Sequence, residues 1–339
     1  MANTGFSRLL ALIAAILALV LILAGLSQVN TASTPANNLS SGENSSLIKT
    51  FTGHKDAVSS IAINADSETF ASGSYDKTIK LWNLKTGELL NTLKGHQEPI
   101  LSLAISPDRK TLISGGVDNT IYFWNLNTGK PISHQLSDGG WITSLAVSSD
   151  GKTLVSGRTG NLINLWNLPT GDLSRTLQEQ ISLPILSVAV NHDNKLFASG
   201  GSDNTIRLWD LETGQLLRTL AGHTGWITSL GLSTDGKTLA SGSVDTTIRL
   251  WNLRTGEQQR TLRANSYSVL SVAISPDNQL LASGGLDGEI RIWDLETGER
   301  LRTISGAHSK AISSLAFSPN GQLLISGSAD STIKTWQVN

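Results

Sequence analysis

Apolar and polar residues alternate in short runs along most of this chain, from residue 47 to its end. A run such as VSSIAI is followed by a turn such as SPDN, and a second run ends in Ser-Gly. After a short turn that usually contains Asp, a third run ends in Trp, and a turn such as LKTG leads to a fourth run such as ELLNTL. Period-two alternation bounded by turn residues is typical of β-strands, so each such unit is predicted to contain four strands.

The unit repeats at a fixed distance along the chain. Tryptophans spaced 42 or 43 residues apart mark it, at Trp82, Trp124, Trp166, Trp209, Trp251, Trp293 and Trp336. A sustained period of this length is typical of arrays of identical small sheets. We therefore predict an all-β fold, a seven-bladed β-propeller of four-stranded antiparallel blades.

The two ends of the repeat region complement each other. The seventh unit stops at Trp336–Asn339, before its fourth run can form. The segment Leu47–His54, LIKTFTGH, aligns with Leu89–His96, LLNTLKGH, although it precedes the first unit. A strand contributed by this segment would complete the last blade and remove the exposed edges of an open array. The propeller is therefore predicted to span residues 47–339.

An apolar segment precedes the repeats. Leu9–Leu26 contains eighteen uncharged, almost entirely apolar residues, and a helix of this length spans about 27 Å, close to the thickness of a bilayer core. Arg8 precedes it, and no Lys or Arg follows until Lys49, which favours residues 1–8 in the cytoplasm and the propeller outside. We predict a single-pass transmembrane signal anchor at 9–26. The alternative is a cleaved signal that exports a soluble propeller.

The residues between this segment and the repeats form a separate region. Residues 27–46 are rich in Ser, Asn, Thr and Ala, which is the composition of a flexible linker.

Composition limits the chemistry that the chain can perform. The 339 residues carry a formal net charge of −1 and include no cysteine, which excludes disulfides, thiolate metal sites and a cysteine nucleophile. The basic residues are spread evenly, so the charge pattern gives no reason to expect a nucleic acid as partner. No metal-binding or cofactor-binding spacing occurs, and we expect neither a metal nor a cofactor.

Polar residues also recur at fixed distances before each repeat Trp. Ser stands ten residues before every one, and Asp stands six residues before all but Trp166, where Gly160 replaces it. His54, His96 and His223, each after Gly, and His308, after Ala, precede four of the first strands, and Trp-Asp or Trp-Asn closes the third strand in six repeats. In these features the chain resembles the WD-repeat β-propellers, and the apolar N-terminus suggests a bacterial-type, membrane-anchored member.

The resemblance implies a buried hydrogen-bond network of His, Ser, Asp and Trp in each complete repeat. Four repeats have all its members: His54, Ser72, Asp76 and Trp82; His96, Ser114, Asp118 and Trp124; His223, Ser241, Asp245 and Trp251; His308, Ser326, Asp330 and Trp336. Asp138, Ile181 and Asn265 stand at the His position of repeats three, four and six. These three repeats are therefore expected to lack the link made by His.

Two patterns resemble catalytic or ligand-binding motifs. Ser, His and Asp are the residue types of a nucleophilic triad, but a set that recurs in repeat after repeat and ends on an indole is better explained as a structural network. Gly231–Thr238, GLSTDGKT, matches a phosphate-binding loop, yet it falls between two predicted strands, whereas that motif requires a following helix.

Function is expected in the variable loop positions. The resemblance implies that partners bind the face where the Asp turns meet the entries to the first strands. Residues 25 before each Trp, or just before the Asp position, supply the candidates Tyr75, Trp141, Trp226, Pro99, Pro184, Val244 and Leu286. Weaker candidates are Tyr267, beside Ser268, and Arg158, in the repeat that lacks Asp. Aromatic side chains with polar neighbours are common anchors of protein interfaces. Alternatively, Trp141 and Trp226 only cover the ends of their blades.

The pattern as a whole favours a non-catalytic scaffold, a monomeric propeller tethered to a membrane that binds a protein or peptide. Two other functions are compatible with the sequence. One is a small-ligand or enzymatic propeller that uses the central channel, and the other is a structural envelope protein with no discrete ligand. Because one fold serves many functions, the preference for protein binding depends partly on the resemblance.

Overall fold

The computed structural model describes residues 46–178, 183–264 and 267–338. The predicted cytoplasmic N-terminus, the predicted anchor at 9–26 and all but the last residue of the predicted linker lie outside the described residues. Within the described ranges, no helix is long and apolar enough to span a bilayer. Residues 46–339 form one compact unit.

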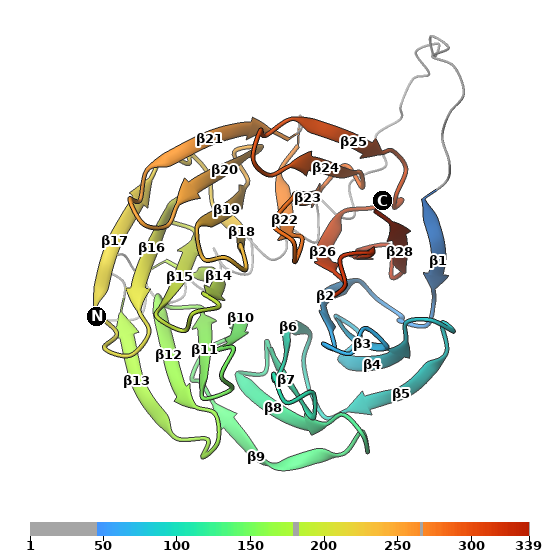
Figure 1. Ribbon diagram of the computed structural model, residues 1–339. Coiled ribbons are helices and arrows are strands. Elements are labelled where there is room, and N and C mark those ends of the chain that lie inside the picture. Colours follow the sequence, from blue (N-terminus) through green and yellow to red (C-terminus); the bar gives the residue numbers. More distant parts are fainter. Residues whose placement is uncertain (1–45, 179–182, 265–266, 339) are drawn as a thin grey trace, which may run out of the picture. The chain divides into compact units, whose positions relative to one another are not determined.

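Seven separate sheets of four antiparallel strands form a ring (Figure 1). Blade 1 contains β2 (Val58–Ile63), β3 (Thr69–Ser74), β4 (Thr78–Asn83) and β5 (Leu89–Lys94), and blade 2 contains β6 (Ile100–Ile105), β7 (Thr111–Gly116), β8 (Thr120–Asn125) and β9 (Pro131–Ser137). Blade 3 contains β10 (Ile142–Val147), β11 (Thr153–Arg158), β12 (Leu162–Asn167) and β13 (Leu173–Gln178), and blade 4 contains β14 (Ile185–Val190), β15 (Leu196–Gly201), β16 (Thr205–Asp210) and β17 (Leu216–Ala221). Blade 5 contains β18 (Ile227–Leu232), β19 (Thr238–Ser243), β20 (Thr247–Asn252) and β21 (Gln258–Arg263), and blade 6 contains β22 (Val269–Ile274), β23 (Leu280–Gly285), β24 (Ile290–Asp294) and β25 (Arg300–Ile304). The predicted all-β seven-bladed propeller is confirmed.

Blade 7 combines strands from both ends of the described chain. It contains β26 (Ile312–Phe317), β27 (Leu323–Ser328), β28 (Ile333–Gln337) and β1 (Leu47–Phe51), and β1 pairs antiparallel with β28 at its outer edge (Figure 1). The Lys49 ammonium group on β1 donates to the Lys85 and Thr86 carbonyl oxygens of blade 1, at 3.0 and 2.6 Å. The outer strand of blade 7 is thereby bound to the neighbouring blade as well as to its own.

The core lies between adjacent blades, because the strands have apolar side chains on both sheet faces. In one such cluster, Ala71 and Ile79 of blade 1 pack with Ile100, Leu112 and Trp124 of blade 2, and all five are at most 1 % exposed. Each blade therefore needs both neighbours to bury its surfaces, as expected for a repeat that cannot fold alone.

A closed circle of serine hydroxyls joins the first strands, an arrangement that the sequence analysis missed. In every blade a Ser Oγ accepts the backbone N–H of a residue in the first strand of the next blade, at 2.9–3.1 Å. These serines are Ser60, Ser102, Ser144, Ser187, Ser229, Ser271 and Ser314. All seven stand 22 residues before the repeat Trp, and this constant spacing was the signal available in the sequence.

A second hydroxyl strengthens only some of the interfaces between blades. Ser59, Thr143 and Thr228 donate to a carbonyl oxygen in the first strand of the next blade, at 2.6–2.7 Å, and Ser313 donates in the same way to Val58. Leu stands at this position in blades 2, 4 and 6. Between first strands, two hydroxyl bonds therefore cross each of the interfaces that follow blades 1, 3, 5 and 7, whereas one crosses each of those that follow blades 2, 4 and 6.

Candidate partner-binding face

The two loop positions singled out in the sequence are joined directly in the structure. In all seven blades the N–H of the residue before the Asp position donates to the carbonyl oxygen of the residue 25 before Trp, at 2.9–3.2 Å. The pairs are Tyr75 and Ala57, Val117 and Pro99, Thr159 and Trp141, Ser202 and Pro184, Val244 and Trp226, Leu286 and Ser268, and Ala329 and Ala311. Since each pair adjoins a first strand, and the first strands surround the central axis (Figure 1), the pairs form a ring around one end of the channel. We call it the mouth ring.

The side chains of the mouth ring differ in how much surface they present. Val244 is 36 % exposed, and the rings of Tyr75, Trp141 and Trp226 are half-buried, as are Pro99 and Leu286. Pro184 is buried, so it contributes little surface even though it occupies the predicted position. Tyr267, the neighbour of Ser268, is 57 % exposed.

The Tyr75 hydroxyl group differs from that of an ordinary surface tyrosine. Its desolvation and the nearby Asp56 carboxylate raise the pKa of Tyr75 to about 12. The phenol therefore keeps its proton, and its hydrogen-bond donor, to a higher pH than a surface tyrosine with a pKa of 10.0 does.

Four blades contain the predicted network of His, Ser, Asp and Trp. In blade 1, His54 Nε2 lies 2.7 Å from Ser72 Oγ and Nδ1 lies 2.9 Å from Asp76 Oδ2, while Trp82 Nε1 donates to Ser72 Oγ at 2.9 Å. Blades 2, 5 and 7 repeat these three contacts at 2.7–3.0 Å. The hydroxyl-bearing serines are fully buried, so none is placed to attack a substrate.

These networks support the mouth ring. In blade 1 the Asp76 carboxylate also accepts the backbone N–H groups of Lys55 and Thr78, at 2.9 and 3.0 Å. It thereby holds the loop before the first strand and the turn after the second strand together. The neighbouring Tyr75 and Ala57 are fixed by the same contacts, and the other three complete networks act in the same way.

Blade 3 has a network in which a carboxylate replaces the imidazole. Ser156 Oγ donates to Asp138 Oδ2 at 2.6 Å, and Trp166 Nε1 donates to Ser156 Oγ at 2.9 Å. Asn164 Nδ2 donates to the other carboxylate oxygen. Repeat three thus lacks the link made by His, and Asp138 replaces it at Ser156, because a carboxylate oxygen accepts the serine hydroxyl as an imidazole nitrogen does. The sequence analysis did not anticipate this replacement.

Arginine pairs with the turn Asp in two blades without His. Arg207 Nη1 lies 2.7 Å from Asp203 Oδ2 in blade 4, and Arg291 Nη2 lies 2.9 Å from Asp287 Oδ2 in blade 6. Both arginines stand two residues before the repeat Trp, a position that the sequence analysis did not consider. Ile181 and Asn265, which occupy the His position there, lie outside the described residues.

A fall in pH is expected to weaken the hydrogen-bond network of blade 5. Burial alone would raise the pKa of Asp245, but hydrogen bonds from Thr247, Thr224 and His223 outweigh it and lower the pKa to about 2. Burial lowers the pKa of His223 below 6.5 in spite of Asp245. The contribution of Asp245 to stability is thus present above pH 3.8 and lost as the pH falls towards 2. The contribution of His223 to stability is fully present above pH 6.5 and declines as the pH falls below this value.

We therefore predict that the thermal midpoint falls as the pH is lowered from 7 to 3. A His223→Gln variant should show a shallower slope between pH 7 and 5, and Asp245→Asn a shallower slope below pH 4, in thermal unfolding followed by tryptophan fluorescence. A variant slope equal to that of the parent in its window would contradict the assignment.

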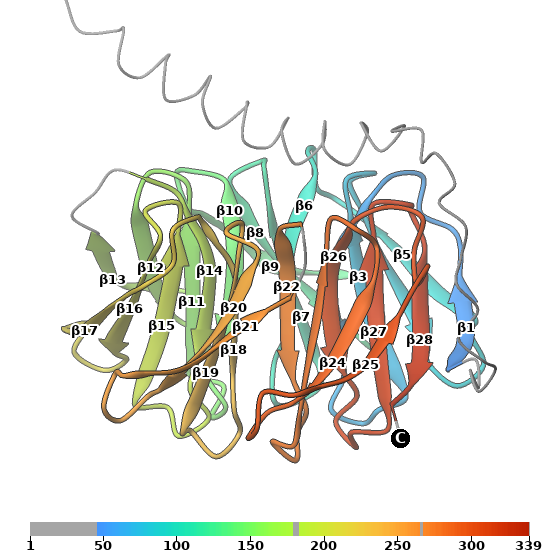
Figure 2. The same ribbon diagram turned by 90° about the horizontal axis from the view of Figure 1, so that it is seen from above.

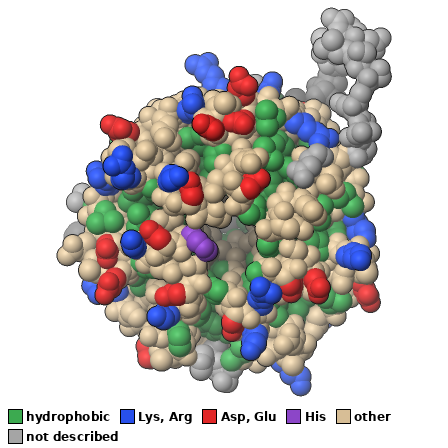
Figure 3. All heavy atoms as spheres, viewed as in Figure 1, with side chains coloured by type: hydrophobic (Ala, Val, Ile, Leu, Met, Phe, Trp, Pro, Cys, Tyr) green, Lys and Arg blue, Asp and Glu red, His purple; other side chains and the backbone are tan. Residues whose placement is uncertain are grey.

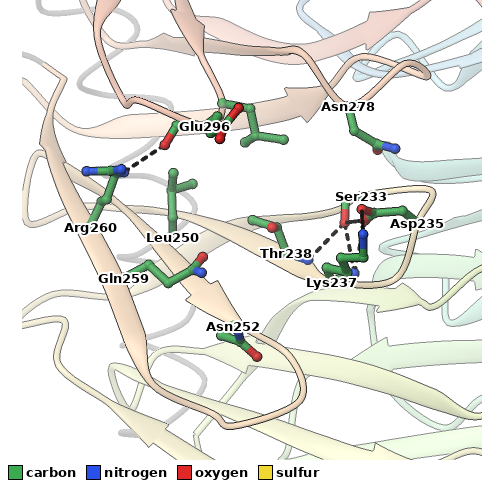
Figure 4. A pocket seen from close by; sticks show the side chains of 11 residues that line it. Ser233, Asp235, Lys237, Thr238, Leu250, Asn252, Gln259, Arg260, Asn278 and Glu296 are labelled. Carbon is green, nitrogen blue, oxygen red and sulfur yellow. Dashed lines mark hydrogen bonds and ion pairs between the residues drawn. The ribbon is translucent and has the colours of Figure 1, made fainter.

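The opposite ends of the strands offer polar grooves between blades. A groove of about 600 Å³ between blades 5 and 6 is lined by charged and amide side chains over Leu250 and Leu295 (Figure 4). Its charges are mostly satisfied within the protein: Lys237 Nζ lies 3.3 Å from Asp235, and Arg260 Nε donates to the Glu296 carbonyl oxygen at 2.9 Å (Figure 4). The face in Figure 3 shows side chains of both signs interspersed around a central hollow. Within the described part of the chain, no group of side chains is suited to hold a metal ion.

Seven four-stranded blades around a channel, with a loop face held by buried networks, define a β-propeller of the repeat type. The model for the WD domain, G-beta repeat, matches residues 45–83, 87–125, 129–167, 171–210, 214–252, 256–294 and 298–337. These matches cover most of the chain, which therefore belongs to the WD40 repeat family.

Similarity to individual curated proteins is confined to short stretches. The chain is 49 % identical over 45 residues to a U4/U6 small nuclear ribonucleoprotein PRP4-like protein of Arabidopsis thaliana, a match that covers 13 % of this chain and 8 % of the relative. It is also 49 % identical over 41 residues to the pre-mRNA-splicing factor prp46 of Emericella nidulans and of Aspergillus fumigatus, each match covering 12 % of this chain and 9 % of the relative. The chain thus spans less than a tenth of the length of these relatives.

Proposed function

We propose that the chain is a non-catalytic interaction scaffold that binds a protein or peptide on the mouth ring. We further propose that residues 9–26 anchor it in a membrane, with the propeller on the extracytoplasmic side. WD40 propellers typically act as such scaffolds, and one of the proteins that match a short stretch of the chain is named as a small nuclear ribonucleoprotein.

The observation that carries the proposal is the composition of the mouth ring. Two half-buried indoles, Trp141 and Trp226, stand two blades apart, and Val244, Leu286 and Tyr75 add partly exposed apolar surface. The seven pairs contain no carboxylate, ammonium, guanidinium or imidazole group. Such a ring favours burial of apolar and aromatic side chains of a partner. The same composition offers an enzyme no carboxylate, imidazole or ammonium group as a general acid or base.

Affinity capture from native membranes tests the proposal. Residues 41–339 would be compared with a Trp141→Ala, Trp226→Ala double variant, which should lose at least tenfold in affinity for the captured partner because hot-spot aromatics commonly contribute about 2 kcal/mol or more each. The matched control is Leu217→Ala, Leu301→Ala. It removes two leucines that are 50 and 55 % exposed on the outer strands, away from the mouth ring.

The outcomes separate the possible functions. Partner loss in the tryptophan variant alone supports the mouth ring, whereas equal retention by both variants contradicts it.

The anchor is tested by fractionation: the full chain should sediment with membranes and a chain lacking residues 1–26 should not. Equal distribution of the two would overturn the anchor and leave the binding face untouched.

A further inference from the structure

Blade 3 lacks the turn carboxylate that the other six blades have, and the glycine that replaces it borders open space. Gly160 stands at the position of the turn Asp, and a Cβ atom placed on it would meet no atom within 4 Å. In the complete blades the Asp carboxylate accepts the N–H of the residue after His, as Asp76 does from Lys55 at 2.9 Å. The corresponding residue in blade 3 is Gly139, whose N–H makes no hydrogen bond within the described residues.

An arginine borders this open space. Arg158 ends the second strand of blade 3, where the other blades have Ser or Gly. Its side chain is 13 % exposed, and its buried Nε has no hydrogen-bond partner in the part of the chain that the structure describes. The guanidinium lies against the loop before Trp141, because a side chain on Gly139 would come within 2.9 Å of Arg158 Nη1.

The nearest carboxylate leaves the guanidinium donors unused. Asp138 Oδ1 lies 3.7 Å from Arg158 Nε, which is beyond hydrogen-bond distance. The Asp138 oxygens are taken instead by Ser156 and Asn164. Burial also raises the pKa of Asp138, which weakens it as a counter-charge. Arg158 is therefore a cation at the binding face whose hydrogen-bonding capacity is not filled by the described residues.

We propose that blade 3 contains a carboxylate-binding site in which Arg158 and the Gly139 N–H receive an acidic group of the partner. The partner's carboxylate substitutes for the turn Asp that the other six blades contain. Guanidinium groups bind carboxylates through paired, charge-assisted hydrogen bonds. Since Trp141 follows the glycine loop directly, the site selects a peptide with Asp or Glu beside a large apolar residue. This inference rests on the proposed partner-binding function.

Peptide binding tests the site. Detergent-solubilised full-length chain would be applied to an array of octapeptides that carry Asp or Glu beside Phe or Leu, each paired with its Asn or Gln counterpart. Acidic peptides should bind about tenfold more tightly than their amide counterparts, as expected for a charge-assisted contact. Arg158→Gln should abolish that difference, and Arg158→Lys should retain part of it.

A second pair of variants keeps Arg158 in place. Gly160→Asp would supply an internal carboxylate to the open space, whereas Gly160→Asn has the same shape and tolerates the positive φ of 91° equally well. Gly160→Asp should lose the preference for acidic peptides, and Gly160→Asn should keep it. A preference that survives in Arg158→Gln, or that is equal in the two Gly160 variants, overturns the site.

Trp141→Ala separates the inference from the function on which it depends. Binding that requires Trp141 but shows no preference for acidic peptides overturns the carboxylate site and leaves the mouth ring as the binding face. Absence of any peptide that binds through Trp141 overturns both.

Discussion

Replacing Phe51 by Ala is expected to lower the free energy of unfolding by about 3–5 kcal/mol, as is usual for a buried Phe that leaves a cavity. Phe51 is 3 % exposed, and its ring centroid lies 5.0 Å from that of Phe70 and 5.6 Å from that of Trp82. It belongs to β1 in blade 7, whereas Phe70 and Trp82 belong to blade 1. The substitution therefore weakens the contact between blade 7, which contains the first and the last strand, and its neighbour blade 1.

Urea unfolding followed by tryptophan fluorescence measures this effect. The matched control is Ile48→Ala on the same strand, where the side chain is 50 % exposed and a change within about 0.5 kcal/mol is expected. Equal midpoints for the two variants would show that β1 contributes no packing to the ring.

Replacing Ser241 by Ala is expected to lower the free energy of unfolding by about 3 kcal/mol, because two buried polar groups lose their partner and each unsatisfied group costs about 1–3 kcal/mol. Ser241 is fully buried, and its Oγ lies 2.7 Å from His223 Nε2 and accepts Trp251 Nε1 at 2.9 Å. The substitution removes one oxygen, and the buried indole N–H and imidazole nitrogen are then left without a hydrogen-bond partner.

The exposed Ser174 on β13 provides the control for this loss of a hydroxyl group. Ser174→Ala should leave the urea midpoint unchanged within error. A Ser241→Ala variant as stable as Ser174→Ala would mean that the network contributes nothing to stability, and the case for its support of the mouth ring would fail with it.

The fold could be predicted because its information is local and repeated. Strand alternation has a period of two, and the constant spacing between Trp residues places every repeat in the same frame. The mouth ring followed from the same spacing, since residues at equal distances from Trp82 and Trp251 occupy equivalent places in their blades. Spacing fixes position but not exposure, and Pro184 is buried in a position where Trp226 is partly open.

The partners of buried charges could not be predicted from spacing. Arg207 and Arg249 occupy the same position in blades 4 and 5, yet Arg207 pairs with the turn Asp of its blade and Arg249 donates to Gln258. In blade 5 the carboxylate of the corresponding Asp245 already bonds to His223. Which donor takes a carboxylate depends on the other donors that reach it, and these come from loops far apart along the chain.

Interfaces with two hydroxyl bonds between first strands alternate around the ring with interfaces that have one. Two kinds of interface can alternate without error only around an even ring, and seven is odd, so like interfaces must meet once. They meet at blade 1, where the Val58 carbonyl oxygen accepts a hydrogen bond from Ser313 of blade 7 and Ser59 donates one to blade 2. The unavoidable mismatch thus falls on the doubly bridged kind of interface, beside the blade in which the two ends of the ring are joined.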